Sequence, residues 1–242
     1  MFYEKIINIF LNNTINIDSK LRALIIYDSS TLNILKYFVS ALNQKNIFTI
    51  CKKIDLKKNH GFEPPVSIAN AMYDSNLVLC LTKYSMAHSK ARNNFSKKGG
   101  RFLSMPGYSK KILSNKALLA NFKKHETITK KISKILSLGK RCKILSEDGT
   151  NLECDMNGRL ANSCPGHVIE KGSLGSPPDI EANISPIENR SNGFLIINGS
   201  IANEKIGLLK KPIYLVIKKG KITEIKSKSK KINNLLKKTF YE

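Results

Sequence analysis

The feature that most constrains the fold is a short, continuous apolar run near the N-terminus. Residues 22–28 read RALIIYD and are rich in Ile. Such a run is typical of a strand buried on both faces of a parallel sheet, because a half-buried strand would alternate apolar and polar residues. Residues 29–31 offer a helix N-cap, apolar residues recur at helical spacing up to Leu42, and 47–51 (IFTIC) indicates the next strand. This order predicts a right-handed crossover and a parallel sheet.

The same alternation of strand and helix continues to about residue 138. The expected elements are a helix at 66–73, a buried strand at 76–81, a basic helix at 87–98, a strand at 101–104 and helical residues over 110–138. We expect Leu24–Tyr27 and Leu77–Cys80 to be interior strands of the sheet, because both are rich in β-branched residues or Leu and are flanked by turn and cap residues.

The pattern changes at Gly139. Two alternating segments, 141–146 and 151–156, flank Asp148-Gly149, which is a strong hairpin signal. Residues 157–179 are rich in Gly, Pro and Ser and are expected to be mostly loop. Further strands are expected at 180–187, 194–198 and 213–217, with a turn at Lys219-Gly220 and a final amphipathic helix from about residue 229. The sequence therefore predicts an α/β fold: a Rossmann-like, mostly parallel domain at 1–138 and a strand-rich α+β domain at 139–242.

Charge and cysteine content bound the function. The chain has 242 residues and a formal net charge of +23. Clustered lysines favour a polyanion partner, whereas abundant Lys, Ile and Asn without Trp is also typical of an AT-rich coding sequence. We favour the compositional explanation and do not expect a nucleic-acid partner.

The five cysteines lack metal-site spacing and are expected to be reduced. No apolar run approaches the roughly 20 residues of a membrane span, and no signal peptide is evident, so we expect a cytoplasmic protein.

Two places in the sequence are candidates for chemistry. The hydroxyl-rich segment from Tyr84 to Ser89 follows a predicted buried strand, where Ser85 and His88 could orient a polar substrate or transfer a proton. The alternative is an ordinary helix N-terminus capped by Ser85. Glu181 enters an apolar strand next to a Pro/Gly loop, which is a reasonable position for a ligand of a divalent cation; the alternative is a solvent-facing edge residue.

A series of short motifs extends from residue 63 to residue 200. In order, they are Glu63-Pro64-Pro65, Ser85–Arg92, Gly100–Gly107, Asp148–Leu152, Gly158-Arg159, Pro178–Glu181, Ser185–Glu188, Ser191–Gly193 and Asn198–Ser200. Together they resemble the aminopeptidase T-type metallopeptidases and their relatives, the 2,5-dihydroxypyridine ring-opening dioxygenases, over roughly residues 20–228.

The resemblance implies an α/β domain followed by a metal-carrying domain with one or two divalent cations, of which zinc, cobalt and iron are the candidates. It implies that Glu181 is the first carboxylate ligand, and that His88, Ser85 and, more weakly, His167 line the substrate pocket. The family's other metal ligands follow the region that matches Lys219-Gly220. Residues 226–242 contain no histidine. We therefore expect an incomplete metal site, as in a truncated, split or degenerate member.

The first functional hypothesis is a metal-dependent aminopeptidase in which a metal-bound water attacks the peptide carbonyl. The alternatives are a ring-opening dioxygenase of the same family, a non-catalytic binding or relic protein, and a basic polyanion-binding protein. The expected partners are a small peptide or another small-molecule substrate and a second copy of the chain in a homodimer, with no membrane.

Overall fold

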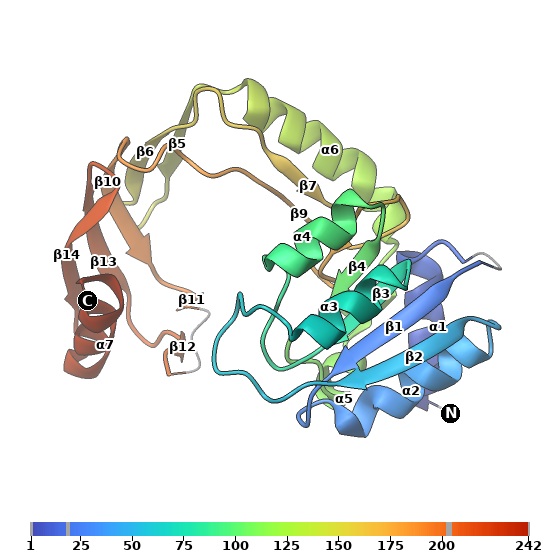
Figure 1. Cartoon of the computed structure of the whole chain (residues 1–242). Coiled ribbons are helices and arrows are strands. Elements are labelled where there is room, and N and C mark those ends of the chain that lie inside the picture. The colour runs from blue at the N-terminus through green and yellow to red at the C-terminus, as the bar shows by residue number, and fades with distance from the viewer. Residues whose placement is uncertain (1, 18–19, 202–204, 242) are drawn as a thin grey trace. The chain divides into compact units, whose positions relative to one another are not determined.

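The computed structural model describes residues 2–17, 20–201 and 205–241, without the side chain of Tyr241. The chain forms two compact units, Met1–Lys131 with Ser163–Ala182 and Ile132–Asn162 with Asn183–Glu242 (Figure 1). From the sequence, the second domain was expected to run from Gly139 to the end. The structure instead groups 163–182 with the first unit, because the short strand β8 (Leu174–Gly175) in this segment pairs with the parallel sheet.

The sheet of the first unit has five strands in the order β2-β1-β3-β4-β8, and all of its pairs are parallel. Its other strands are β1 (Arg22–Tyr27), β2 (Phe48–Lys53), β3 (Leu77–Leu81) and β4 (Arg101–Ser104). β1 and β3 are interior strands, which confirms the prediction for Leu24–Tyr27 and Leu77–Cys80. The short β8 was missed, because two residues in a Gly- and Ser-rich segment carry no periodic signal.

Helices cover both faces of this sheet. They are α1 (Phe2–Thr14), α2 (Leu32–Asn43), α3 (Val66–Tyr73), α4 (Lys90–Lys97), α5 (Lys110–Leu113) and the 3₁₀ turn η1 (Lys116–Leu119). The next helix, α6 (Phe122–Leu138), begins in this unit with the buried Phe122 and ends in the second unit. Successive β1 side chains point to opposite faces: Ile25 packs in the cluster with α1 and α2, whereas Leu24 packs in the cluster with α3 and α4. Burial on both faces explains why these strands are continuous apolar runs.

The expected helical stretch over 110–138 is broken into three pieces. Its first break follows Leu113, where the Asn115 side chain accepts a hydrogen bond from the Ala117 amide and starts η1. The second lies before α6, where the Asn121 side chain accepts from the Lys124 amide. Asn side chains favour caps over helix interiors, and this is the physical reason for both breaks.

The second unit is built on an antiparallel five-stranded sheet in the order β14-β13-β10-β6-β5. Its strands are β5 (Arg141–Leu145), β6 (Asn151–Asp155), β10 (Ser191–Ile197), β13 (Ile213–Lys218) and β14 (Lys221–Ser227), and the C-terminal helix is α7 (Lys230–Tyr241). The hairpin predicted at Asp148-Gly149 joins β5 to β6, and Gly149 has a positive φ of 100°. The predicted turn at Lys219-Gly220 joins β13 to β14, with positive φ at both residues.

Two short ribbons complete the described strands. β7 (Asn162–Cys164) pairs with β9 (Glu181–Asn183), and β11 (Ser200–Ile201) pairs with β12 (Gly207–Leu208). The strand expected over 180–187 is thus confined to Glu181–Asn183. Pro186 follows shortly after and has no backbone N–H to donate to a sheet, which is consistent with the early end of the strand.

The structure bears on the expectations for the cysteines, for a membrane span and for a homodimer. All five cysteines are free thiols, as predicted. No helix within residues 2–17, 20–201 and 205–241 is both long enough and apolar enough to span a bilayer.

α6 exposes an apolar stripe at helical spacing, with Ile128, Ile132, Ile135 and Leu138 all at least 44% exposed. The homodimer expected from the sequence stays a prediction.

We predict that replacing Leu79 with Ala lowers the free energy of unfolding by about 2–5 kcal/mol, because Leu79 is fully buried in the central strand β3 and its truncation leaves a cavity. Val66→Ala is the control: Val66 is 76% exposed, and its truncation should change stability by about 0.5 kcal/mol or less. Urea unfolding followed by circular dichroism measures both. Equal losses in the two variants would contradict the two-sided burial of the sheet.

Candidate functional site

The parallel sheet brings several loops to one edge. All five strands run in the same direction, so the segments after β1, β3, β4 and β8 leave from the same side of the sheet. β1 lies between β2 and β3, so the chain first adds β2 on one side of β1 and then adds β3 on the other side. The strand order therefore reverses at β1. In open α/β sheets, ligands bind in the crevice outside the carboxyl ends of the strands at such a reversal.

Asp28 holds two of these loops together. It directly follows β1 and is 1% exposed. One carboxylate oxygen accepts from the Ser30 amide and hydroxyl, and the other accepts from the Lys83 amide at 2.7 Å. A buried carboxylate is costly unless it is hydrogen-bonded, and these donors satisfy it. Asp28 therefore fixes the loop after β1 against the loop after β3.

Ser85 is the centre of a polar cluster in the loop after β3. Its Oγ lies 3.0 Å from Ser104 Oγ at the end of β4 and also accepts from the Ala87 amide. Its backbone N–H donates to His60 Nδ1 at 3.1 Å, and its carbonyl accepts from the Gly61 amide at 2.8 Å. Three segments far apart in sequence thus meet at Ser85.

His60 is oriented by this contact. Because Nδ1 accepts a hydrogen bond, the proton of the neutral ring lies on Nε2. The ring also packs edge-on against Tyr84, with ring centroids 5.2 Å apart. His60 is exposed, so its Nε2–H can donate to a molecule bound at this edge.

His88 lies in the turn before α4 and is exposed. The helix start beside it is already satisfied: Ser89 Oγ accepts from the Arg92 amide, and the Glu63 carboxylate accepts from the Lys90 and Ala91 amides. Ser89, and not Ser85, is therefore the N-cap. The first amides of α4 are therefore not available to a ligand, and a role for Ser85 and His88 in substrate binding stays a prediction.

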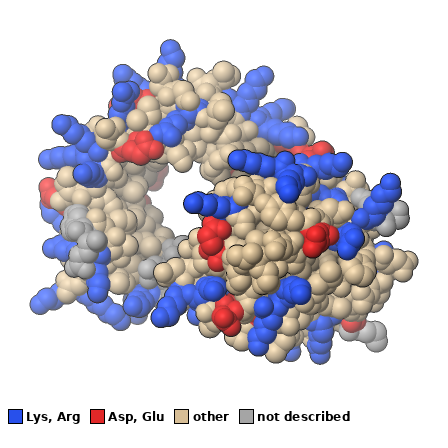
Figure 2. All heavy atoms as spheres, viewed as in Figure 1, with Lys and Arg blue, Asp and Glu red and all other residues tan. Residues whose placement is uncertain are grey.

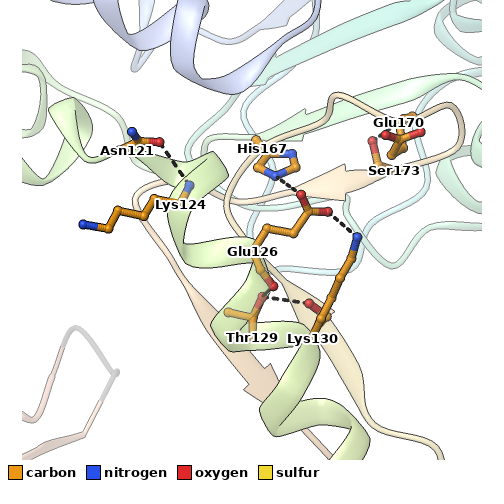
Figure 3. A network of polar contacts seen from close by, with 9 residues as sticks. Asn121, Lys124, Glu126, Thr129, Lys130, His167, Glu170 and Ser173 are labelled. Carbon is orange, nitrogen blue, oxygen red and sulfur yellow. Dashed lines mark hydrogen bonds and ion pairs between the residues drawn. The ribbon is translucent and has the colours of Figure 1, made fainter.

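His167 belongs to a different group of contacts. It is 3% exposed, and its Nε2 lies 3.4 Å from the Glu126 carboxylate of α6, which is also paired with Lys130 at 2.8 Å (Figure 3). On the same helix, Thr129 Oγ1 accepts from Ser163 Oγ at 2.8 Å. Both ring nitrogens of His167 are buried without a hydrogen-bond partner among the described residues, so Nε2 meets Glu126 only at ion-pair distance.

Burial lowers the pKa of His167 below its ordinary value of 6.5, because desolvation disfavours the charged ring. The Glu126 carboxylate acts in the opposite direction, and Lys123 and Lys130 add to the lowering. The net direction favours a neutral imidazole at neutral pH. His167 is thus placed as a buried neutral ring that faces a carboxylate.

The loop after β8 brings carboxylates to the same edge. Burial, with the nearby Glu181 as a second cause, raises the pKa of Asp179. Tyr108, in the loop after β4, donates its hydroxyl to the Pro177 carbonyl at 2.6 Å. Burial and the charge of Asp179 raise the pKa of Tyr108 well above its usual range. Glu181 begins β9 and is exposed, and it acts electrostatically on Asp179.

The donor set does not match a complete metal centre. Within the described part of the chain, no three side chains of His, Cys, Asp or Glu come together in a way that could hold a metal ion. Asp179 and Glu181 are two neighbouring carboxylates, which is fewer than the three protein ligands of a typical catalytic zinc site. Glu181 as a metal ligand stays a prediction.

Several residues of the site were not singled out from the sequence as chemically important. Asp28, His60 and Tyr108 act through partners distant in sequence, as does Glu126 through His167. Asp28 carried a usable signal, since an acidic residue directly after a buried strand lies at the ligand-binding edge of the sheet. His60 and Glu126 carried no such sequence signal, because their contacts depend on how distant loops and helices pack against one another.

The fold and the Ser85 cluster define an α/β protein with polar groups gathered at the carboxyl edge of a parallel sheet. A family model described as NicX, 2,5-dihydroxypyridine 5,6-dioxygenase, matches residues 34–238. The match covers most of the chain, which therefore belongs to this family. Of the two relatives named from the sequence, the matching family model is that of the ring-opening dioxygenases. No curated protein matches the chain.

Two solved structures share the fold. The 2,5-dihydroxypyridine dioxygenase of Pseudomonas putida KT2440 matches with a TM-score of 0.82 and 16% identity, over 97% of this chain and 71% of that chain. Wild-type AmpT of Thermus thermophilus matches with a TM-score of 0.63 and 11% identity, over 98% of this chain and 73% of that chain. At these identities the likeness shows a shared fold, which confirms the predicted α/β class.

The environment of His167 predicts a pH dependence of stability. A histidine whose pKa is lowered by folding binds fewer protons in the folded state than in the unfolded chain as pH falls through 6.5, so stability decreases there. A single group contributes at most about 1.4 kcal/mol per pH unit. We predict that His167→Gln flattens the fall of unfolding free energy between pH 7.5 and pH 5.5, and that the same change at exposed His88 does not. An unchanged slope in His167→Gln would contradict the buried neutral ring.

Proposed function

We propose that this protein binds a small polar substrate at the carboxyl edge of its parallel sheet, and that Ser85 and His88 contact it. The observation that carries the proposal is the Ser85 cluster, where hydroxyl and imidazole groups from three segments meet at the reversal point of the sheet. A hydroxylated pyridine, the substrate class in the family's name, suits this cluster because its hydroxyl groups donate and accept hydrogen bonds and its ring nitrogen accepts them.

Each group has a role that its geometry supports. The Ser85 and Ser104 hydroxyls, 3.0 Å apart, form a pair that can donate to and accept from a substrate hydroxyl. His60 presents Nε2–H as a donor. His88 follows Ser85 closely in the chain and is exposed, and it would accept a proton from an acidic substrate hydroxyl. Together these residues would bind, orient and deprotonate the substrate.

The metal-dependent step of the family is not assigned to this set of residues. Because the described side chains do not assemble three metal ligands, the role proposed for them is substrate binding and proton transfer. Glu181, with Asp179 beside it, is the best candidate for a carboxylate that faces a divalent cation, and it would need further ligands to hold one tightly.

A second candidate function is the binding of a peptide N-terminus for aminopeptidase activity. It is favoured by the carboxylates of Asp179 and Glu181, since a protonated amino group is stabilised by nearby negative charge. The structural match to AmpT is consistent with it. The two candidates use different parts of the same edge: hydroxyl and imidazole groups for the pyridine, and carboxylates for the amine.

Calorimetric titration with 2,5-dihydroxypyridine and, separately, with leucinamide tests the proposal. We predict that the pyridine binds, and that Ser85→Ala and His88→Ala each weaken binding by roughly tenfold, the loss of about one hydrogen bond or slightly more. Ser114→Ala and His125→Ala are the matched controls, because they make the same changes away from the cluster, and they should leave the dissociation constant unchanged.

The pattern of losses separates the candidates. Binding of leucinamide that depends on Glu181 but not on His88, without binding of the pyridine, would overturn the pyridine assignment in favour of the peptide amine. Binding of neither ligand, or equal losses in the control variants, would contradict a substrate site at this edge.

A further inference from the structure

Lysines are concentrated in the last part of the second unit. In sequence order they are Lys205, Lys210, Lys211, Lys218, Lys219, Lys221, Lys226, Lys228, Lys230, Lys231, Lys237 and Lys238. Between Lys205 and Tyr241 the sequence has one acidic residue, Glu224, which pairs with Lys226 at 3.0 Å. These residues fold into β13, β14, α7 and the segments beside them, and Figure 2 shows lysine side chains around the C-terminal helix. This set is called the α7 basic surface below.

The α7 basic surface is hollowed on two sides. One hollow of about 530 Å³ is lined by Lys205, Lys231 and Lys238, with Asn234 and Leu235 between them. Lys231, Asn234, Leu235 and Lys238 follow one another at helical spacing, so they form a single stripe along α7. A second hollow of about 400 Å³ is lined by Lys226 and Lys228 together with Tyr214, Ile225, Ser227 and Asn233.

The lysines at the start of α7 do not stabilise the helix, whereas Lys238 in its last turn does. Lys230 and Lys231 stand in its first turn, which contains no acidic residue. Cations near a helix N-terminus oppose the helix dipole and destabilise the helix by a few tenths of a kcal/mol to about 1 kcal/mol. A bound anion at this end would remove that repulsion. The lysines of the first turn therefore point to an anionic partner more than to helix stability.

The apolar face of α7 is already occupied. Leu236 is 3% exposed and packs with Ile213, Leu215 and Ile225 of the sheet, and Ile232 packs against the same cluster. A helix that lies in a membrane surface needs a free apolar face to insert. The packing of α7 covers Ile232 and Leu236, and of its remaining apolar residues Leu235 lines the first hollow and Phe240 is 51% exposed near the end of the helix.

Tyr214 adds an aromatic group to the second hollow. It is 45% exposed on β13, and its cross-strand partner on β14 is Lys226. An exposed ring beside a lysine matches the combination found in proteins that bind single-stranded nucleic acid, where bases stack on aromatic rings and lysines contact the phosphates. Asn233, in the same hollow, donates its side-chain amide to the Ser227 carbonyl at 3.0 Å, so it shapes the hollow and does not bind a ligand.

We propose that the α7 basic surface binds single-stranded nucleic acid, with Lys228, Lys231 and Lys238 contacting phosphates and Tyr214 stacking on a base. The site is separate from the substrate edge of the first unit and independent of the function proposed there. The proposal goes against the expectation from composition, because a uniform enrichment in lysine does not by itself explain lysines that line two hollows beside an exposed tyrosine.

Fluorescence anisotropy with labelled oligo(U) over a salt series tests the proposal. Each phosphate contact with a single strand contributes about 0.7 to the slope of log K against log salt. We predict that Lys228→Gln/Lys231→Gln/Lys238→Gln reduces that slope by about 2. The matched control is Lys5→Gln/Lys97→Gln/Lys131→Gln, which removes the same charge from exposed positions of the first unit and should change the slope by much less. Circular dichroism verifies that both variants fold.

The tyrosine separates base stacking from general attraction to polyanions. Tyr214→Ala should weaken oligo(U) binding by about fivefold or more, whereas Tyr214→Phe keeps the ring and should bind as the wild type does. Binding of heparin should be insensitive to both changes. Equal slopes in the two lysine variants, no effect of Tyr214→Ala, or binding to phosphatidylserine vesicles without binding to oligo(U) would each overturn the proposal.

Discussion

The constraint on which the rest of the structure depends is the burial of β1 and β3 on both faces of a parallel sheet. The carboxyl ends of parallel strands all lie at one edge of the sheet. Because helices cover both faces, the loops at that edge are where polar groups can gather. Asp28 fixes the arrangement, because its buried carboxylate joins the loop after β1 to the Lys83 amide of the loop after β3. The cluster around Ser85 and the loop that contains Asp179 both follow from this geometry.

Sequence patterns predicted the elements whose signal is local. The apolar runs of β1 and β3, the Asp148-Gly149 hairpin and the C-terminal helix were all found, because each is specified by its own residues. β8 was missed, since its two residues are defined only by pairing with β4. Periodicity likewise did not show that Asn115 and Asn121 break the long helix expected over 110–138.

The same distinction holds for the site. The sequence shows that Ser85 and His88 follow a buried strand, whereas the contacts of Ser85 with His60 and with Ser104 at the end of β4 depend on the assembled sheet. His167 was named as a pocket residue, yet its partner Glu126 lies on a helix whose position the sequence does not reveal. A metal centre depends even more on long-range assembly, and among the described residues the carboxylates of Asp179 and Glu181 are not joined by a third ligand.

The most direct test of the central claim is to map, residue by residue, where 2,5-dihydroxypyridine binds, by following backbone amide NMR signals of the whole protein during a titration. We predict that the largest shifts fall in the loops at the carboxyl edge, at His60, Ser85 and His88, with small shifts in β10, β13 and β14. Shifts concentrated in those antiparallel strands, with the loop after β3 unaffected, would contradict it.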